Sequence, residues 1–206
     1  MGRHILFSIL SDMCYYLYES LSCIERGKVT VAYTLARKPL QDNLYYLCWL
    51  LDNPNDFYKM LKNKDPKEYD VSNLKSNKED VINMYSRILN IINEEKLLSF
   101  EPLSAELLYE LIYDRKSKRG LSQIFDKSIH LVTNNPNYKT EKNNLNFIFA
   151  DDKIWSEFWE YYYLKFPYIL LFVVEVVIQN FERMLLIPKN VCEVNSLIRN
   201  LKFFIN

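Results

Sequence analysis

Glycine is scarce in this chain, with three residues among 206. An all-β protein needs glycine at many of its tight turns, so this scarcity argues against a β-sandwich or barrel and favours helices. The chain also lacks a net charge, because 26 basic residues balance 26 acidic ones. No overall field therefore draws the protein to nucleic acid or to an anionic membrane, although a local basic cluster could still do so.

The patterns typical of metal sites and disulfide frameworks are missing as well. The four cysteines are scattered without a Cys-x-x-Cys pair, and neither of the two histidines is near a cysteine in sequence. We therefore expect no metal site and no cofactor. Three of the cysteines lie within apolar helical patterns, where a thiol behaves as a small buried hydrophobe. This usage predicts reduced thiols and a cytoplasmic protein; the four are Cys14, Cys23, Cys48 and Cys192.

No hydrophobic run is long enough for an obvious membrane span. The most apolar run, residues 168–178, is shorter than the ~20 residues that a spanning helix needs, and it contains Glu175. The apolar residues 5–10 are followed by Ser11 and Asp12 and lack a small-residue cleavage site, unlike a signal peptide. The sequence therefore predicts no contact with a membrane. It also has no glycine-rich phosphate loop and no nucleophile elbow.

What the chain does have is apolar residues at three- and four-residue steps, the spacing of amphipathic helices. We predict an all-α fold with at least seven helices, in a single domain over residues 1–206. Two long N-terminal helices are expected, the first ending at Gly27 and the second covering 29–51 with a bend at Pro39. A kinked apolar helix, bent at Pro167, is expected near the C-terminus.

Capping residues and prolines predict the shorter elements. A helix begins at Asn53-Pro54, and a capping box at residues 76–79 begins another. Further helices are expected from Ser104 to a basic turn, over 121–132, from near Lys153 after a cap at Asp151, and over 192–204. The segments left over are a polar surface loop at about 62–75 and a long asparagine-rich loop at about 133–146.

A polar cluster, Ala-Arg-Lys-Pro-Leu-Gln-Asp-Asn at residues 36–43, interrupts the most apolar helix. An arginine placed there either lies on a solvent-facing stripe, pairs with a carboxylate such as Glu175, or marks a polar site at the kink. In its helix order and in this apolar–Arg–polar–apolar context, the segment resembles the HEPN superfamily (higher eukaryotes and prokaryotes nucleotide-binding domains). The resemblance implies a helical bundle, with RNA-cleaving toxins and defence effectors among its relatives.

The resemblance also implies where a catalytic pair would stand. Active HEPN members carry an arginine, commonly followed by a polar residue, and a histidine four to six positions further on. Arg37 and Lys38 match the opening, but Asn43 stands where the histidine would fall. Asparagine cannot exchange a proton near neutral pH, so it cannot replace the histidine as a general acid or base. We therefore expect a bundle of similar shape that binds without cutting.

The one well-placed imidazole is His130, beside the asparagine-rich loop. A histidine at a helix end can simply stabilise the terminal carbonyls. Alternatively, His130 is a general base or a ligand contact, with hydrogen-bonding partners from the loop. Those candidate binding residues are Thr133, Tyr138, Lys139 and Thr140.

A basic turn lies just before the helix that carries His130. Four of its five residues are cations that could contact phosphates, although charge runs of this length are more often solvated loops. The candidate binding residues are Arg115, Lys116, Lys118 and Arg119, together with Asn43 at the kink.

Aromatic side chains crowd residues 155–166, either as a base-stacking platform or, more typically at helical spacing, as core and interface. The sequence thus leaves two hypotheses. The favoured one is a non-catalytic interaction or regulatory bundle that forms a homodimer through its apolar C-terminal helices. The alternative is an RNA-directed nuclease-type toxin or phage-defence effector that uses His130, Arg37 and the basic turn to bind RNA or a nucleotide.

Overall fold

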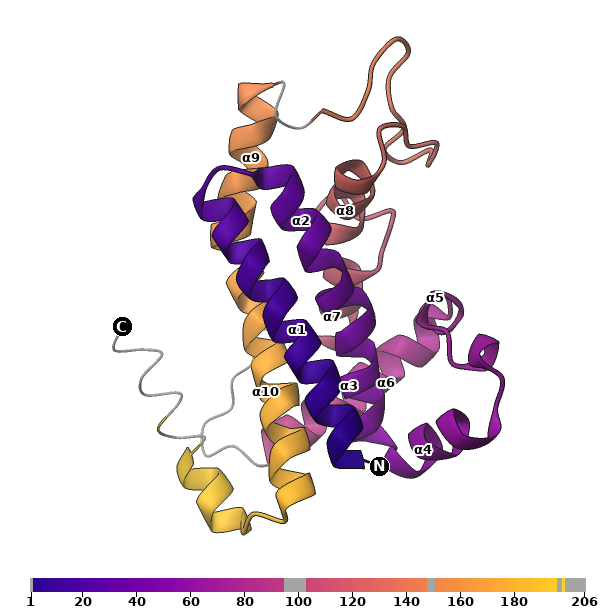
Figure 1. Ribbon diagram of the computed structural model, residues 1–206, viewed down its shortest axis with the longest axis vertical. Coiled ribbons are helices and arrows are strands. Elements are labelled where there is room, and N and C mark those ends of the chain that lie inside the picture. Colours follow the sequence, from indigo (N-terminus) through magenta and orange to yellow (C-terminus); the bar gives the residue numbers. More distant parts are fainter. Residues whose placement is uncertain (1, 95–102, 148–150, 196–197, 199–206) are drawn as a thin grey trace.

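The computed structural model describes residues 2–94, 103–147, 151–195 and 198. Every regular element in this part of the chain is a helix and none is a strand, so the predicted all-α bundle is confirmed (Figure 1). The first elements are α1 (Gly2–Glu25), α2 (Val29–Lys38), the π-helix η1 (Pro39–Asn43), α3 (Leu44–Asp52) and α4 (Pro54–Asn63). The later ones are η2 (Pro66–Glu68), α5 (Val71–Leu74), α6 (Lys78–Glu94), α7 (Ala105–Ile112), α8 (Leu121–Ile129), α9 (Asp152–Leu164) and α10 (Phe166–Leu185).

The two N-terminal helices form an antiparallel pair, and the predicted end of the first helix at Gly27 is confirmed (Figure 1). Gly27 has a φ of +71°, and its N–H donates to the carbonyl of Ile24 at 2.9 Å. The next N–H, of Lys28, donates to Cys23 at 2.9 Å. These bonds satisfy the carbonyls at the end of α1 and reverse the chain. Trp155 of α9 donates its indole N–H to the Gly27 carbonyl at 3.2 Å, so the turn also anchors the C-terminal helices.

Gly27→Ala is expected to lower the free energy of unfolding by about 1–2 kcal/mol, because a left-handed backbone places a Cβ against the following carbonyl. Urea denaturation followed by circular dichroism measures the loss. Gly27→Asn is the matched comparison and should lose less, since asparagine tolerates this conformation. Equal losses for the two variants would show that the loss does not come from the backbone conformation.

The predicted bend at Pro39 is a π-helical turn. Proline has no N–H to donate and its ring crowds the preceding turn, so the regular α-helical bonding is interrupted there. The wider turn of η1 takes up this interruption, and the N–H of Leu44 donates to the carbonyl of Pro39, five residues earlier. The expected second helix over 29–51 is therefore confirmed in extent and divided into α2, η1 and α3.

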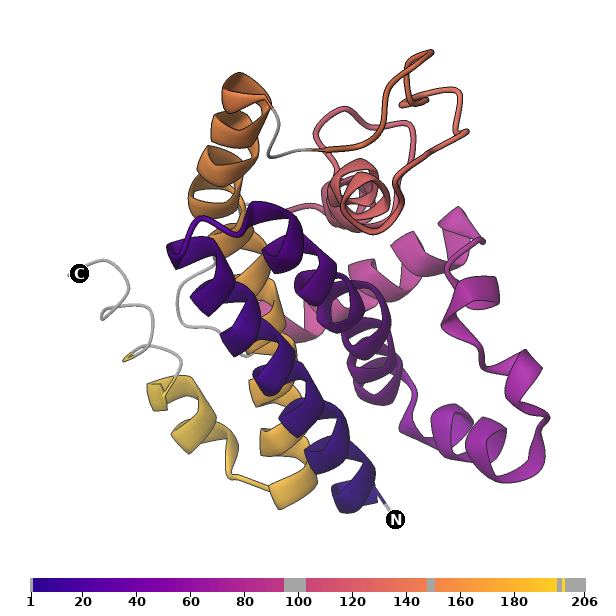
Figure 2. The ribbon, with the colours of Figure 1, turned by 45° about the horizontal axis from the view of Figure 1, so that its top comes forward.

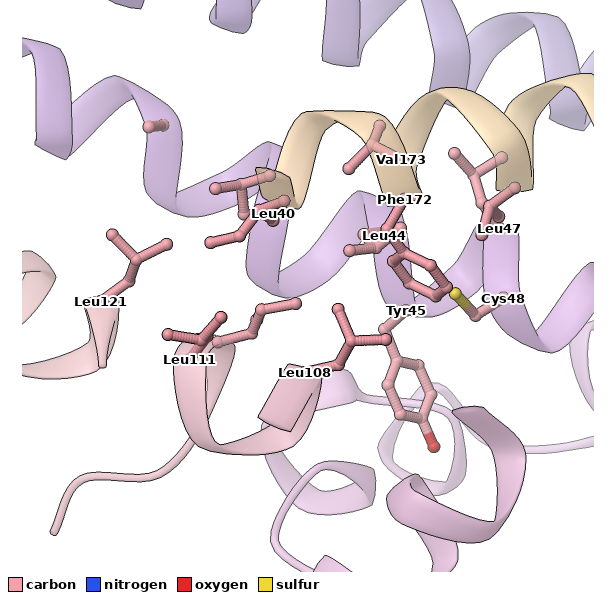
Figure 3. Close-up of a cluster of buried hydrophobic side chains, with 14 of the residues drawn as sticks. Leu40, Leu44, Tyr45, Leu47, Cys48, Leu108, Leu111, Leu121, Phe172 and Val173 are labelled. Atoms are coloured by element: carbon pink, nitrogen blue, oxygen red, sulfur yellow. The ribbon is translucent and has the colours of Figure 1, made fainter. Parts of the chain in front are cut away.

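That divided helix supplies the centre of the core. Leu40, Leu44 and Leu47 are fully buried. Figure 3 shows them in one cluster with Leu108 of α7 and Phe172 of α10. Elements from both ends of the sequence therefore share one cluster of buried side chains.

Helices α9 and α10 follow each other as one long column beside α1 (Figures 1 and 2). The break between them lies at Lys165, next to the predicted kink at Pro167. By length and composition alone, Asp152–Leu185 could cross a membrane, with a mean hydropathy of 1.6 over its best window. One side of this stretch packs against the rest of the bundle. Asn180, for example, is buried and donates its amide to the carbonyl of Leu47 at 3.0 Å. The cytoplasmic location stays a prediction.

Several predicted boundaries need correction. The polar loop at 62–75 is not all loop, since η2 and α5 lie within it. Helix α6 is not capped by a box over 76–79: it begins at Lys78, and Asn77 donates its side-chain amide to Asp80 at 2.5 Å. Helix α8 ends at Ile129, three residues before the predicted end, because His130 is already extended.

Three predicted helix caps and the long loop are confirmed, and the start of the last helix is corrected. Asn53, Ser104 and Asp151 each cap the helix expected of them, with a side-chain oxygen that accepts from a backbone N–H. Residues 130–147 contain no helix or strand, so the long loop is confirmed. The last helix begins at residue 189 rather than 192, and most of its predicted extent past 195 lies outside the described residues.

Candidate functional site

The π-helical turn places residues five apart on one side of the helix. Lys38 and Asn43 both reach Asp12 of α1: the Lys38 ammonium lies 2.8 Å from the carboxylate, and Asn43 donates its amide at 2.8 Å. Burial alone would raise the pKa of Asp12, but the bonds from Asn43 and Lys38 outweigh it and the pKa is lowered. Asn43 is itself buried. Its side chain therefore joins α1 to the π-helix.

Arg37 and Asp42 form the second such pair, on a different side of the π-helix. Asp42 accepts from the ammonium of Lys75 at 3.3 Å. Arg37 is half-buried and makes no hydrogen bond or ion pair within the described residues, and its charge acts on Lys75. The predicted pairing of Arg37 with Glu175 is thus not seen among the described contacts. The side chains of Arg37 and Asn43 therefore lie on different sides of the π-helix.

The basic turn is held rigidly by its neighbours. Ser117 is buried and donates to a carboxylate oxygen of Glu110 at 2.8 Å, and its hydroxyl accepts from the N–H of Arg119 at 3.0 Å. A Cβ on Gly120 would lie 2.7 Å from the Glu110 carbonyl, so only glycine fits there. Tyr161 of α9 donates its hydroxyl to the carbonyl of Arg119. The four cationic side chains of the turn are exposed: Arg115, Lys116, Lys118 and Arg119.

His130 follows α8 directly. Its N–H donates to the carbonyl of Asp126 at 2.9 Å, and its own carbonyl accepts from the amide of Asn146 at 2.8 Å. The imidazole is exposed and makes no hydrogen bond within the described residues. The loop therefore contacts the main chain of His130 and not its imidazole ring. This arrangement fits a histidine at a helix end and places no proton-transfer partner beside the ring.

The asparagine-rich loop is organised by threonine hydroxyls. Thr133 donates its hydroxyl to the carbonyl of Tyr138 at 2.9 Å, and the backbone N–H of Thr133 donates to the hydroxyl of Thr140 at 2.8 Å. The Thr140 hydroxyl also donates to Asn146 at 2.9 Å. Three of the four loop residues proposed to bind a ligand thus bond to the loop itself. The fourth, Lys139, is exposed.

One contact does connect the loop with the basic turn. Tyr138 donates its hydroxyl to Asp126, and the guanidinium of Arg115 lies 3.8 Å from the same carboxylate oxygen. Burial is the largest cause that raises the pKa of Tyr138 to about 12, and the Asp126 carboxylate adds to it. Asp126 therefore links two of the predicted binding segments.

Two pockets lie beside the predicted binding segments. A pocket of about 320 Å³ is lined by Arg115 and Lys116. A second pocket of about 520 Å³, beneath the loop, is lined by Lys139 and Thr140. The RNA-directed hypothesis requires Arg37, Arg119 and His130 to share one cleft, and none of the three lines either of these two pockets.

Sequence reasoning missed three residues at the first pocket. Lys75 stood in a segment interpreted as a surface loop, Gln41 stood between the more conspicuous Arg37 and Asn43, and Asp126 carried no motif. The available signal was spacing: Asp126 stands four residues before His130 in the helix expected over 121–132, and residues so spaced in a helix are neighbours. For Lys75 no local pattern could have shown that it folds against the π-helix.

A second candidate site is an apolar groove between α1 and the α9–α10 column. It has a volume of about 250 Å³. Its lining is almost entirely hydrocarbon and aromatic: Leu17, Tyr18, Leu21, Tyr162, Tyr163, Phe166, Pro167 and Leu170. Tyr18 is 71 % exposed and Leu21 is 44 % exposed. The predicted aromatic segment thus divides, with Tyr162 buried in the core and Tyr163 exposed at the groove.

Taken together, the described residues define an all-α bundle with a polar pocket at its π-helical turn and an apolar groove on another face. No family model, curated protein or solved structure matches this chain. The HEPN resemblance therefore stays a prediction.

Proposed function

We propose that this protein is a non-catalytic interaction bundle that forms a homodimer through the apolar groove between α1 and α9–α10. The observation that carries the proposal is the exposure of large apolar side chains at that groove. Tyr18, Leu21 and Tyr163 are exposed there, and Leu164 and Tyr168 add exposed apolar area at the same junction. Contiguous apolar surface of this kind marks protein interaction sites.

A second copy of the chain is the occupant that the physical chemistry favours. The formal net charge is zero, so two copies do not repel each other as they approach. An isologous interface is self-complementary, and apolar aromatic surface can face a copy of itself without unpaired charges. Tyrosine is also among the residues enriched at interfaces, because its ring is apolar and its hydroxyl can remain hydrated.

Leu21→Glu is expected to convert the dimer to a monomer, because it places a charge in the apolar interface. Light scattering coupled to size-exclusion chromatography measures the mass of each species. Val31→Glu is the matched control: Val31 is 46 % exposed against 44 % for Leu21, also on a helix, and does not line the groove. It should stay dimeric.

Three outcomes would overturn this proposal. The wild type could be a monomer, both variants could dissociate alike, or the wild type could bind lipid vesicles through Leu21 instead of a second copy. Circular dichroism of both variants checks that each keeps its helical content.

The RNA-directed enzyme remains a second candidate function, and one observation favours it: Asp126 joins the basic turn to the loop that follows His130. Under that function His130→Ala abolishes RNA cleavage and leaves most RNA binding, since imidazole can exchange a proton near pH 7. Under the interaction function the wild type already fails to cleave RNA. A cleavage assay with labelled RNA separates the two, with Lys62→Gln, at an exposed lysine of α4 outside the candidate sites, as the surface-charge control.

A further inference from the structure

The pocket at the π-helical turn concentrates positive charge. Lys75, Arg115 and Lys116 line it, from the turn after α5 and from the basic turn. Arg37 stands close enough for its charge to act on Lys75. Four cations from three separate segments of the chain therefore lie in or beside a cavity of about 320 Å³.

The carboxylates nearby are already engaged. Asp42 accepts from Lys75, and Asp114 accepts from the backbone N–H of Lys116 at 2.8 Å. Asp126 accepts from the hydroxyl of Tyr138 and lies 3.8 Å from the Arg115 guanidinium. Among the described residues, the side chains of Arg37 and Lys116 have no ion pair. The pocket is lined by more cations than carboxylates: Lys75, Arg115 and Lys116 against Asp114 and Asp126.

The pKa of Lys75 responds to its burial and to the positive charge around it. Its side chain is only 17 % exposed. Burial is the largest cause that lowers the pKa of Lys75, and the charges of Arg37 and Arg115 lower it further, against the opposing effect of Asp42. A protonated amine held beside two guanidinium groups is stabilised when an anion enters between them.

The rest of the lining suits a phosphate group. Gln41 donates its amide to the carbonyl of Ile112 at 2.9 Å and to the hydroxyl of Ser122 at 3.2 Å. These two bonds hold the Gln41 side chain in place at the pocket. Ser72 adds a hydroxyl donor to the lining, whereas the Ser76 hydroxyl already donates to the carbonyl of Asn73 at 2.5 Å. Arginine and lysine with hydroxyl donors are the groups that bind phosphate oxygens in proteins. The volume is at the lower end of the ~300–1,000 Å³ of small-molecule pockets.

We propose that this pocket binds a small ligand through a phosphate group held by Lys75, Arg115 and Lys116. The site is separate from the apolar groove and does not depend on self-association. It also differs from the site expected from sequence, since neither His130 nor Arg119 lines it.

Isothermal titration calorimetry of the full-length chain with inorganic pyrophosphate, at constant ionic strength, tests the proposal. One pyrophosphate should bind per chain, and inorganic phosphate should bind at the same site more weakly. Arg115→Gln and Lys75→Met should each weaken binding about tenfold or more, as the loss of a charge-assisted bond does. Lys118→Gln is the matched control from the same turn, outside the pocket, and should change affinity less than about twofold.

The pH dependence gives an independent readout. Because the folded pKa of Lys75 is lowered, the amine loses its proton within an alkaline range in which the unfolded chain keeps it. Pyrophosphate affinity should therefore fall as pH rises through that range, and Lys75→Met should remove this dependence. The other charged or titratable groups that face Lys75 are, beside it, Arg37 and Asp42 and, in the pocket lining, Tyr109, Tyr113, Asp114, Arg115, Lys116 and Asp126.

Because Lys75→Met leaves Asp42 without its ion-pair partner, thermal denaturation followed by circular dichroism checks that a loss of binding in this variant is not a loss of the fold. Arg115→Gln, at an exposed side chain, tests binding independently of that pair. The proposal is overturned if the wild type does not bind pyrophosphate. It is also overturned if Lys118→Gln weakens binding as much as Arg115→Gln, which would indicate diffuse attraction to the turn.

Discussion

Leu47→Ala is expected to lower the free energy of unfolding by about 2–5 kcal/mol, and Leu44→Ala by a similar amount. Both side chains are fully buried at the centre of the core (Figure 3). Removing three carbons there loses their transfer free energy and leaves a cavity that helices α7 and α10 cannot fill without shifting. Urea denaturation followed by circular dichroism measures both variants.

Val31→Ala provides the control for this experiment. Val31 lies on α2 of the same divided helix and is 46 % exposed. Its truncation should change the free energy of unfolding by less than about 0.5 kcal/mol. A loss below about 1 kcal/mol at both Leu44 and Leu47 would show that this helix is not central to the core.

A steep loss of stability is expected above pH 10. Burial raises the pKa of Tyr162 to about 12, and burial followed by the nearby Asp80 carboxylate raises that of Tyr45 to about 12. Burial also raises the pKa values of Tyr85 and Tyr113 well above 10.0. The unfolded chain releases these protons first, so the stabilisation is complete below pH 10 and is lost as pH rises toward the folded values. Each such tyrosine contributes about 1.4 kcal/mol per pH unit.

Tyr45→Phe isolates one of these contributions. The Tyr45 hydroxyl makes no hydrogen bond within the described residues, so the variant removes an ionisable group and little else. Between pH 10 and 11 its free energy of unfolding should fall by about 1 kcal/mol less than that of the wild type. Tyr15→Phe, at a side chain that is 74 % exposed, should follow the wild type. Identical pH dependence in all three proteins would contradict the prediction.

Local sequence signals located the helices well. Gly27, Asn53 and Asp151 act within one turn of the chain, so their effect on a helix end can be recognised without knowing the fold. The details that failed depend on contacts from elsewhere. The end of α8 is set by loop bonds such as that from Asn146 to the His130 carbonyl, and α5 depends on burial of Val71.

The candidate site was harder to predict because its chemistry comes from segments far apart in the sequence. Arg37 and the basic turn were recognised by composition, but Lys75 and Asp126 gain their place only from the tertiary fold. Asn43 was singled out because it stands where the resembled family has its histidine. The π-helical turn changes which residues share a side of the helix, and the side chain of Asn43 contacts Asp12 and not Arg37.

Sedimentation equilibrium of the wild-type chain, over a wide range of concentration, tests the proposed interaction function most directly. The apolar groove should produce a reversible association, with a mass that approaches twice the 24.8 kDa of the chain as concentration rises. Leu21→Glu should sediment as a single chain under the same conditions. A wild-type mass that stays at 24.8 kDa at every concentration would contradict the proposal that the groove binds a second copy.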